Sequence, residues 1–184
     1  MDLVTSAARV LVGLVFLAAV VGKARDVRGF AASIRDLPGL PGLPGLLGLT
    51  RLSRLLATLA VPGVLGAEAA VVVLLADPAT PAWGFTLAVV LDAGFLAVII
   101  RVLRSGTSAA CMCFGTTPRE FGIRHVVRDV LLGVVALVGL TGTAGAHGDA
   151  SGVSVPAWAL CALAGALGAV ALVLLDEIVD LYAG

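Results

Sequence analysis

The chain has 184 residues, of which 60% are hydrophobic and only 13% are charged, and its mean hydropathy is +1.11. Ordinary globular proteins contain about 45–50% apolar and roughly 25% charged residues, so this composition excludes a soluble catalytic domain and indicates an integral membrane protein. The formal net charge is zero and the pI is about 6.7, which excludes the basic surface that a nucleic-acid-binding protein needs.

Five segments approach the roughly 20 apolar residues that are needed to cross a hydrocarbon core about 30 Å thick. They are residues 3–22, 55–76, 82–100, 130–146 and 155–175. We therefore expect an all-α fold, a polytopic membrane bundle of four to five transmembrane helices that residues 1–184 form as a single domain. Five spans are preferred, and four result if the short, glycine-rich fourth segment is re-entrant.

An alternative for the first segment is a cleaved signal peptide, because residues 10–21 have the length of its apolar region. The positive charges Lys23, Arg25 and Arg28 follow this stretch, whereas a signal peptide carries them in front of it. The first segment is therefore predicted to be a retained span.

A short helix is predicted between the first two spans. Val27, Phe30, Ile34 and Leu37 recur at helical spacing, which is typical of an amphipathic helix lying in the membrane interface. It ends at Pro38, and the three Pro-Gly-Leu triplets that follow favour a bent connector.

Lysine and arginine are concentrated in two of the loops. Six lie in residues 23–54 and five in residues 101–128, while Arg9 lies inside the first span and the turns on the other side have none. The positive-inside rule places both basic loops and the acidic C-terminal residues in the cytoplasm. We expect a multi-pass protein of the plasma membrane with its N-terminus outside.

The strongest chemical signal is the sequence Cys-Met-Cys-Phe-Gly at residues 111–115, in the second basic loop. A thiolate is the reactive form of cysteine, and neighbouring cations stabilise it. The basic residues nearby are Arg104, Arg119, Arg124 and His125. Because disulfides are usually transient in the cytosol, this pair is expected to be catalytic, redox-sensing or metal-binding rather than a structural crosslink.

Charged residues inside the spans are the second signal. An acidic side chain near the centre of a span costs about 2.5–3.5 kcal/mol on insertion scales, so Glu68 and Asp92 need a partner or water. At about 1.5 Å per residue, Arg9 and Glu68 lie about 9 and 12 Å from the outer ends of their spans. We expect these two to form an ion pair, either to join the helices or as part of a proton relay or cavity. No obvious cation lies at the level of Asp92.

Other candidates carry less information. Cys161 lies among alanines and leucines and is expected to be a packing residue. His125 is either a metal ligand or base, or a solvated residue of the interface. Gly165 and Gly168 in the fifth span are expected to permit close helix contact.

Several of these residues occur in an order that resembles the MauE branch of the MauE/DoxX-like membrane proteins. They are Gly22-Lys23, Phe30, Pro38, Glu68, the Cys-Met-Cys-Phe-Gly signature and Arg128-Asp129. Two positions depart from the usual pattern, since Met112 stands where glycine is most frequent and Asp129 where asparagine is also usual. The resemblance covers most of the chain and implies a role in methylamine utilisation, assisting the maturation of methylamine dehydrogenase with a thioredoxin-like partner.

Our leading hypothesis is thiol–disulfide exchange by a catalytic pair, Cys111 and Cys113, with a thioredoxin-like protein or a membrane quinone. The expected supporting residues are Glu68, Asp92, Phe114, Gly115 and Arg128. Two alternatives stay open: a binding or transport protein for soft cations or small solutes, and a non-catalytic scaffold of a membrane complex.

One conflict accompanies the resemblance. Maturation of an exported enzyme requires thiols that face outward, whereas the charge distribution places these thiols inward. Either electrons pass outward from a cytosolic donor, or the loop folds back into the membrane, or the client is a different protein.

Overall fold

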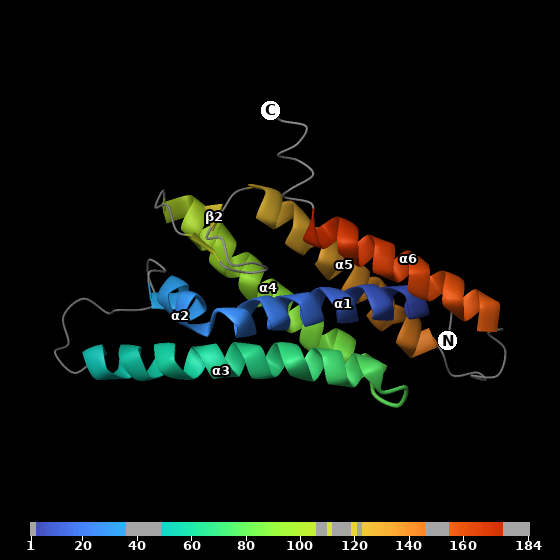
Figure 1. Ribbon diagram of the computed structural model, residues 1–184, viewed down its shortest axis with the longest axis horizontal. Coiled ribbons are helices and arrows are strands. Elements are labelled where there is room, and N and C mark those ends of the chain that lie inside the picture. Colours follow the sequence, from blue (N-terminus) through green and yellow to red (C-terminus); the bar gives the residue numbers. More distant parts are fainter. Residues whose placement is uncertain are drawn as a thin grey trace.

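A computed structural model describes residues 3–35, 49–105, 110–111, 119–120, 123–145 and 155–174. Its elements are α1 (Leu3–Arg25), α2 (Val27–Arg35), α3 (Leu49–Ala76), α4 (Pro81–Ser105), β1 (Ala110–Cys111), β2 (Arg119–Glu120), α5 (Ile123–Gly145) and α6 (Val155–Val173) (Figure 1). The predicted helical bundle is confirmed. The small β1–β2 pair was not expected from the sequence.

Five helices are long and apolar enough to cross a membrane: α1, the part of α3 from Leu59, α4, α5 and α6. The re-entrant alternative for the fourth segment is wrong, because α5 is one continuous helix of 23 residues. This helix begins at Ile123 rather than at residue 130. Its charged first turns are helical too, and they bring the side chains of Arg128 and Asp129 into the bundle, where both are buried.

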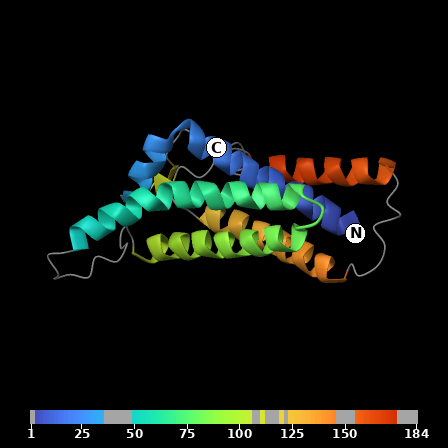
Figure 2. The same ribbon diagram turned by 90° about the horizontal axis from the view of Figure 1, so that it is seen from below.

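Helix α1 occupies the centre of the bundle. It packs against α3, α5 and α6, and 39% of its spanning window is buried, compared with 22–28% for the other four spans. Figure 1 shows α1 between α3 and α6, and Figure 2 shows α3 and α4 side by side. Its core residues Val12, Val15 and Phe16 are almost fully buried. Helix α1 is therefore one of the five candidate spans and contributes to the core of the bundle.

Helix α2 confirms the short helix expected after the first span. The carboxylate of Asp26 accepts a hydrogen bond from the backbone N–H of Gly29 at 2.8 Å, which is the pattern of a helix N-cap. Phe30 and Ile34 are buried against Val61 of α3. The amphipathic face of α2 is therefore used for packing onto the bundle.

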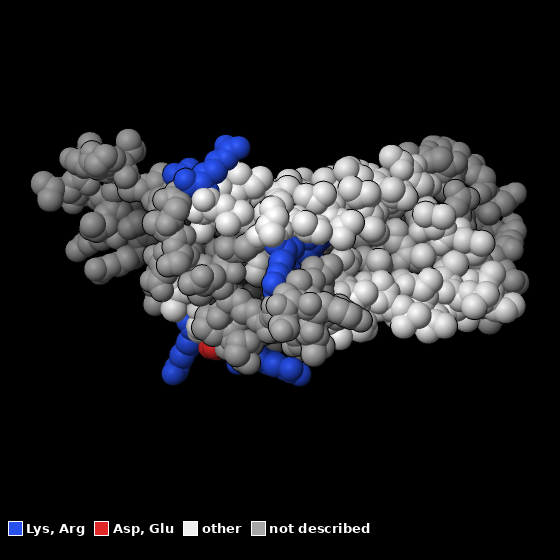
Figure 3. Space-filling model, turned by 90° about the horizontal axis from the view of Figure 1, so that it is seen from above, with Lys and Arg blue, Asp and Glu red and all other residues white. Residues whose placement is uncertain are grey.

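The spanning helices alternate in direction, so the bundle has two ends. We call them the α2 end, where α1 and α4 finish and α3 and α5 begin, and the Trp158 end, where α4 and α6 begin. Both basic loops belong to the α2 end, as the sequence predicts. In Figure 3, Lys and Arg gather toward that end, while the half of this face toward the Trp158 end shows no charged side chain among the described residues.

Glycines allow α6 to approach α1 closely. A Cβ atom at Gly165 would lie 2.6 Å from the carbonyl oxygen of Ala7, and one at Gly168 would lie 2.7 Å from the Leu11 side chain. In lipid, such close backbone contact is a main source of helix association. The predicted packing role of both glycines is confirmed.

Gly165→Ala should lower the free energy of unfolding by about 1–3 kcal/mol, because the new methyl group meets a backbone atom that cannot move alone. Thermal or denaturant unfolding of the purified protein in detergent measures the change. Gly94→Ala is the matched control, since a Cβ there meets nothing within 4 Å. Equal effects of the two substitutions would contradict the packing role.

Candidate functional site

The loop that carries the cysteine signature is anchored by the pair of strands. β1 and β2 are antiparallel, with Ala110 opposite Glu120 and Cys111 opposite Arg119. β1 also contacts α2. Cys111 thus lies at the α2 end, in a backbone position that brings it opposite a basic residue. Cys113, Phe114 and Gly115 lie outside the described residues.

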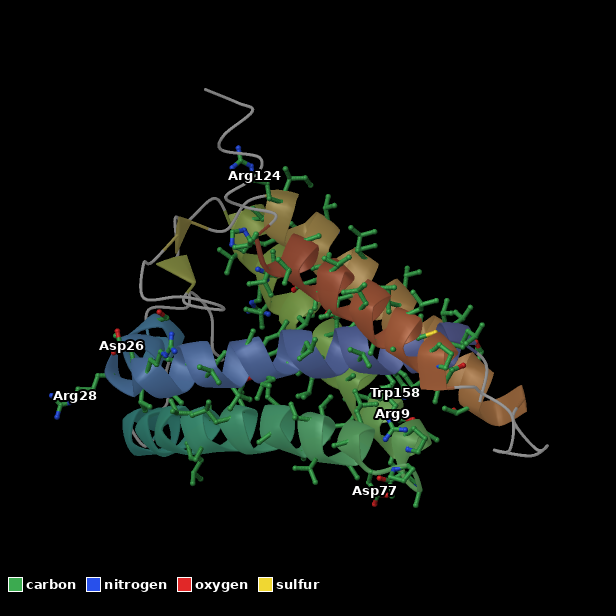
Figure 4. All side chains as sticks on the ribbon, turned by 45° about the vertical axis from the view of Figure 1, so that its right-hand side comes forward. Arg9, Asp26, Arg28, Asp77, Arg124 and Trp158 are labelled. Atoms are coloured by element: carbon green, nitrogen blue, oxygen red, sulfur yellow. The ribbon has the colours of Figure 1, made fainter. Side chains whose placement is uncertain are left out.

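The surroundings of this loop agree in part with the prediction. Arg104 is exposed in the last turn of α4, and Arg124 lies in the first turn of α5 (Figure 4). His125 is only 7% exposed. The interpretation of His125 as a solvated residue is therefore wrong, and it faces the interior of the bundle.

A buried ion pair joins α1 to α3. Lys23 Nζ lies 2.5 Å from Glu68 Oε1, and both side chains are almost completely shielded from solvent. The same ammonium group lies 5.5 Å from the ring centroid of Phe30 and 5.2 Å from that of Phe95, within range for cation–π attraction. Residues from α2, α3 and α4 thus surround the positive charge that α1 contributes.

The prediction that Arg9 forms an ion pair with Glu68 is wrong, because Glu68 pairs with Lys23. Arg9 instead donates from Nε to the carbonyl oxygen of Leu75 and from Nη2 to that of Ala76, the latter at 2.8 Å. It therefore satisfies carbonyl groups at the C-terminus of α3, which have no partner within the helix. Figure 4 shows Arg9 near Asp77 and Trp158, away from the α2 end where Asp26 and Arg28 lie.

The direction of helical side chains explains this error. Each Cα–Cβ bond tilts toward the N-terminus of its helix. Because α1 and α3 are antiparallel, Lys23 tilts toward the middle of the bundle and Glu68 tilts toward the α2 end, so the two converge. Arg9 lies on α1 like Lys23, so its side chain also tilts toward the Trp158 end, and this direction leads away from Glu68. The depth of a residue within its span, counted from the sequence, could not reveal whether Glu68 pairs with Arg9 or with Lys23.

Two adjacent residues of α5 form a second buried pair. Arg128 Nε and Nη2 lie 3.2 and 3.0 Å from Asp129 Oδ1. The exposed fractions are 4% for Arg128 and 5% for Asp129. α5 therefore brings one cation and one anion to the inside of the bundle, at the level where its charged first turns meet α1 and α4.

Asp92 of α4 faces this group. Its side chain is 6% exposed, and a Cβ at Gly133 of α5 would lie 2.6 Å from its Oδ2, so the absence of a side chain there leaves room for the carboxylate. The prediction that no cation lies near Asp92 is wrong, because Arg128 lines the same cavity. Within the described part of the chain, however, no ion pair joins Asp92 to another residue.

These residues line one cavity of about 30 Å³ between α1, α3, α4 and α5. Its lining residues are Val15, Phe16, Ala19, Lys23, Glu68, Asp92, Phe95, Arg128, Asp129 and Leu132. Three expected supporting residues, Glu68, Asp92 and Arg128, are thus brought together. Lys23 was named as a loop charge and as part of the Gly22-Lys23 motif but not as a site residue, and the clue to its place is that a single glycine separates it from the apolar run.

A larger groove of about 660 Å³ lies at the Trp158 end, between α1, α3 and α6. Its lining is apolar apart from Ser6 and Arg9. Along α1 it reaches only to Leu17, so it lies on the far side of the bundle from β1. The groove is therefore separate from β1, the described strand that contains Cys111.

Lys23→Met and Glu68→Gln should each lower the free energy of unfolding by about 3–5 kcal/mol, because each removes one charge of the pair and leaves the other charge buried without a counterion. The double variant should lose much less than the sum, whereas Arg9→Gln combined with Glu68→Gln should be additive. Unfolding in detergent is measured for the wild type, the three single variants, including Arg9→Gln, and the two double variants. Coupling between Arg9 and Glu68, or additivity of Lys23 and Glu68, would contradict the observed pairing.

Comparison with known proteins identifies the relatives of this chain. The sequence profile of one family, described as methylamine utilisation protein MauE, matches residues 1–142. No curated protein and no solved structure matches the chain. The matched part contains α1 to α4, most of α5, the cysteine loop and every residue that lines the buried cavity. The chain is a polytopic membrane protein that belongs to the MauE family.

Proposed function

We propose that this protein performs thiol–disulfide exchange at the membrane, with Cys111 and Cys113 as the reacting pair and a thioredoxin-like protein as the partner. The observation that carries the proposal is the β1–β2 pairing, which places Cys111 opposite Arg119 at the α2 end. The backbone of Cys111 is thus held in a short antiparallel strand pair outside the spanning helices, which supports a role for this residue in exchange with a partner. Membership of the MauE family supports the same role.

The chemistry balances without a further cofactor. A thiolate of the dithiol form attacks a sulfur of the partner's disulfide, which forms a mixed disulfide and releases the partner's other sulfur as a thiolate. The second cysteine, after losing its proton, then attacks the mixed disulfide. The partner leaves as a dithiol, having gained two electrons, and Cys111 and Cys113 remain as a disulfide, having lost two electrons and two protons. The reverse sequence oxidises the partner.

Basic residues at the α2 end favour this reaction. Arg104 and Arg124 lie on the helices that flank the loop, and Arg119 lies on the strand opposite Cys111. A positive neighbour stabilises the thiolate that attacks and the thiolate that leaves. Phe114 and Gly115 are proposed to shape the turn between the strands.

A protein partner fits better than a membrane quinone. A quinone must touch a thiolate in order to react with it, and it needs an apolar site inside the bilayer. The large apolar groove that the described residues form lies at the Trp158 end, across the bundle from β1. β1, in contrast, contacts α2 at the end of the bundle, which supports a water-soluble redox protein as the partner.

We further propose that the whole chain forms one domain in the plasma membrane, with the α2 end in the cytoplasm. The described Lys and Arg side chains gather toward that end, in agreement with the positive-inside rule. Electrons would then be exchanged with a cytosolic thiol protein. A link to methylamine metabolism is proposed on the strength of the family alone.

Replacing the resolving cysteine by serine should trap a mixed disulfide with the partner, because the intermediate loses its route to collapse. Only one of Cys111→Ser and Cys113→Ser should do so, and Cys161→Ser should trap nothing. Non-reducing gels after acid quenching, followed by mass spectrometry of high-mass bands, make the measurement. A scaffold would give no adduct in either variant, and a metal site would lose its metal equally in both.

The orientation can be tested with a membrane-impermeant thiol reagent in a Cys161→Ala background. Cys111 and Cys113 should stay unlabelled in intact cells and react once the inner face is opened. Asp77→Cys, in the exposed turn at the Trp158 end, is the matched control and should react in intact cells. The opposite pattern would place the cysteine loop outside.

A further inference from the structure

The buried cavity contains three carboxylates but only two cations. Lys23 is paired with Glu68, and Arg128 with Asp129, which leaves Asp92 without an ion pair among the described residues. The five side chains belong to residues that are at most 6% exposed. If all five were ionised, the residues that line this buried cavity would carry a net charge of minus one. Burying such a charge costs several kcal/mol.

The same cavity lacks a hydrogen-bond donor. Glu68 is 0% exposed, and its Oε2 atom is buried with no hydrogen-bond partner among the described residues. A buried acceptor without a partner costs about 1–3 kcal/mol. The cavity volume of about 30 Å³ exceeds the roughly 10–15 Å³ that one water molecule requires. One positive charge and one donor are therefore missing from the same place.

We propose that this cavity is a proton-binding site: it takes up one proton, held by the carboxylates of Asp92 and Glu68 together with one water molecule. A single proton supplies both the missing charge and the missing donor. The uptake does not rest on the thiol chemistry, because every residue that lines the cavity lies on a spanning helix and none is a cysteine.

A proton satisfies the site better than a metal ion does. Calcium takes 6–8 oxygen ligands, and magnesium needs near-ideal octahedral coordination. Within the described residues, no group of three His, Cys, Asp or Glu side chains is arranged to hold a metal. The cations of Lys23 and Arg128, which line the cavity, would also repel a metal ion.

Charged groups from every spanning helix around the cavity contribute to its proton affinity. They are Lys23 on α1, Glu68 on α3, Asp92 on α4, and His125, Arg128 and Asp129 on α5. The two ion pairs leave Asp92 as the carboxylate whose charge is balanced only by the added proton. Removal of its charge should therefore remove the uptake while leaving both pairs in place.

Infrared spectroscopy of the purified protein in lipid nanodiscs tests the proposal. Near neutral pH, the wild type should show the C=O stretching band of a protonated carboxyl group, shifted in heavy water, and Asp92→Asn should lose it. Asp77→Asn, which changes an exposed acid in the α3–α4 turn, is the matched control and should keep it. The Cys111→Ser, Cys113→Ser double variant should also keep it, so that failure of the thiol proposal and failure of this one are distinguishable.

Two further measurements keep the test decisive. Raising the pH should lower the melting temperature of the wild type more than that of Asp92→Asn, because only the wild type then gains a buried charge. If Asp92→Asn does not fold, Gly133→Ala replaces it and should shift the band, since its methyl group would meet Asp92 Oδ2. A wild type without the band, an unchanged band in the folded variant, or stabilisation by sodium over choline would overturn the proposal.

Discussion

The contact between Lys23 and Glu68 sets the register of the central helix pair. Apolar side chains do little to specify how membrane helices align, because lipid tails are as apolar as leucine. A charge inside the bilayer, in contrast, has very few acceptable positions. The 2.5 Å contact between Nζ and Oε1 therefore holds α1 and α3 in one alignment, and the bond from Arg9 to the end of α3 holds the same alignment at the other end.

The other helices are arranged around this pair. α4 contributes Phe95, whose ring lies 5.2 Å from Lys23 Nζ, and α2 contributes Phe30 from the end of the bundle. α2 also contacts β1, the strand that contains Cys111. Helix α2 thus contacts both the buried Lys23, through Phe30, and the strand that contains Cys111.

Much of the fold follows from the sequence, because the limits of a lipid bilayer are strict. Five apolar runs, the amphipathic residues before Pro38 and the placement of the basic loops at one end are local or compositional signals. The pairing of Glu68 is different, since it depends on the tilt of side chains on two antiparallel helices. The meeting of Asp92 with Gly133 likewise depends on how α4 and α5 pack, which no pattern within one helix contains.

The family match includes the buried cavity and the cysteine signature but not helix α6. It ends at residue 142, within α5, and so includes every residue that lines the buried cavity, together with the cysteine loop. α6 lies outside it and contributes Gly165 and Gly168 to the packing on α1, and Trp158 to the groove at the far end. The groove therefore depends on a helix that the family signature does not include. The buried cavity and the strand pair that contains Cys111, in contrast, are formed entirely by helices and strands within the matched part.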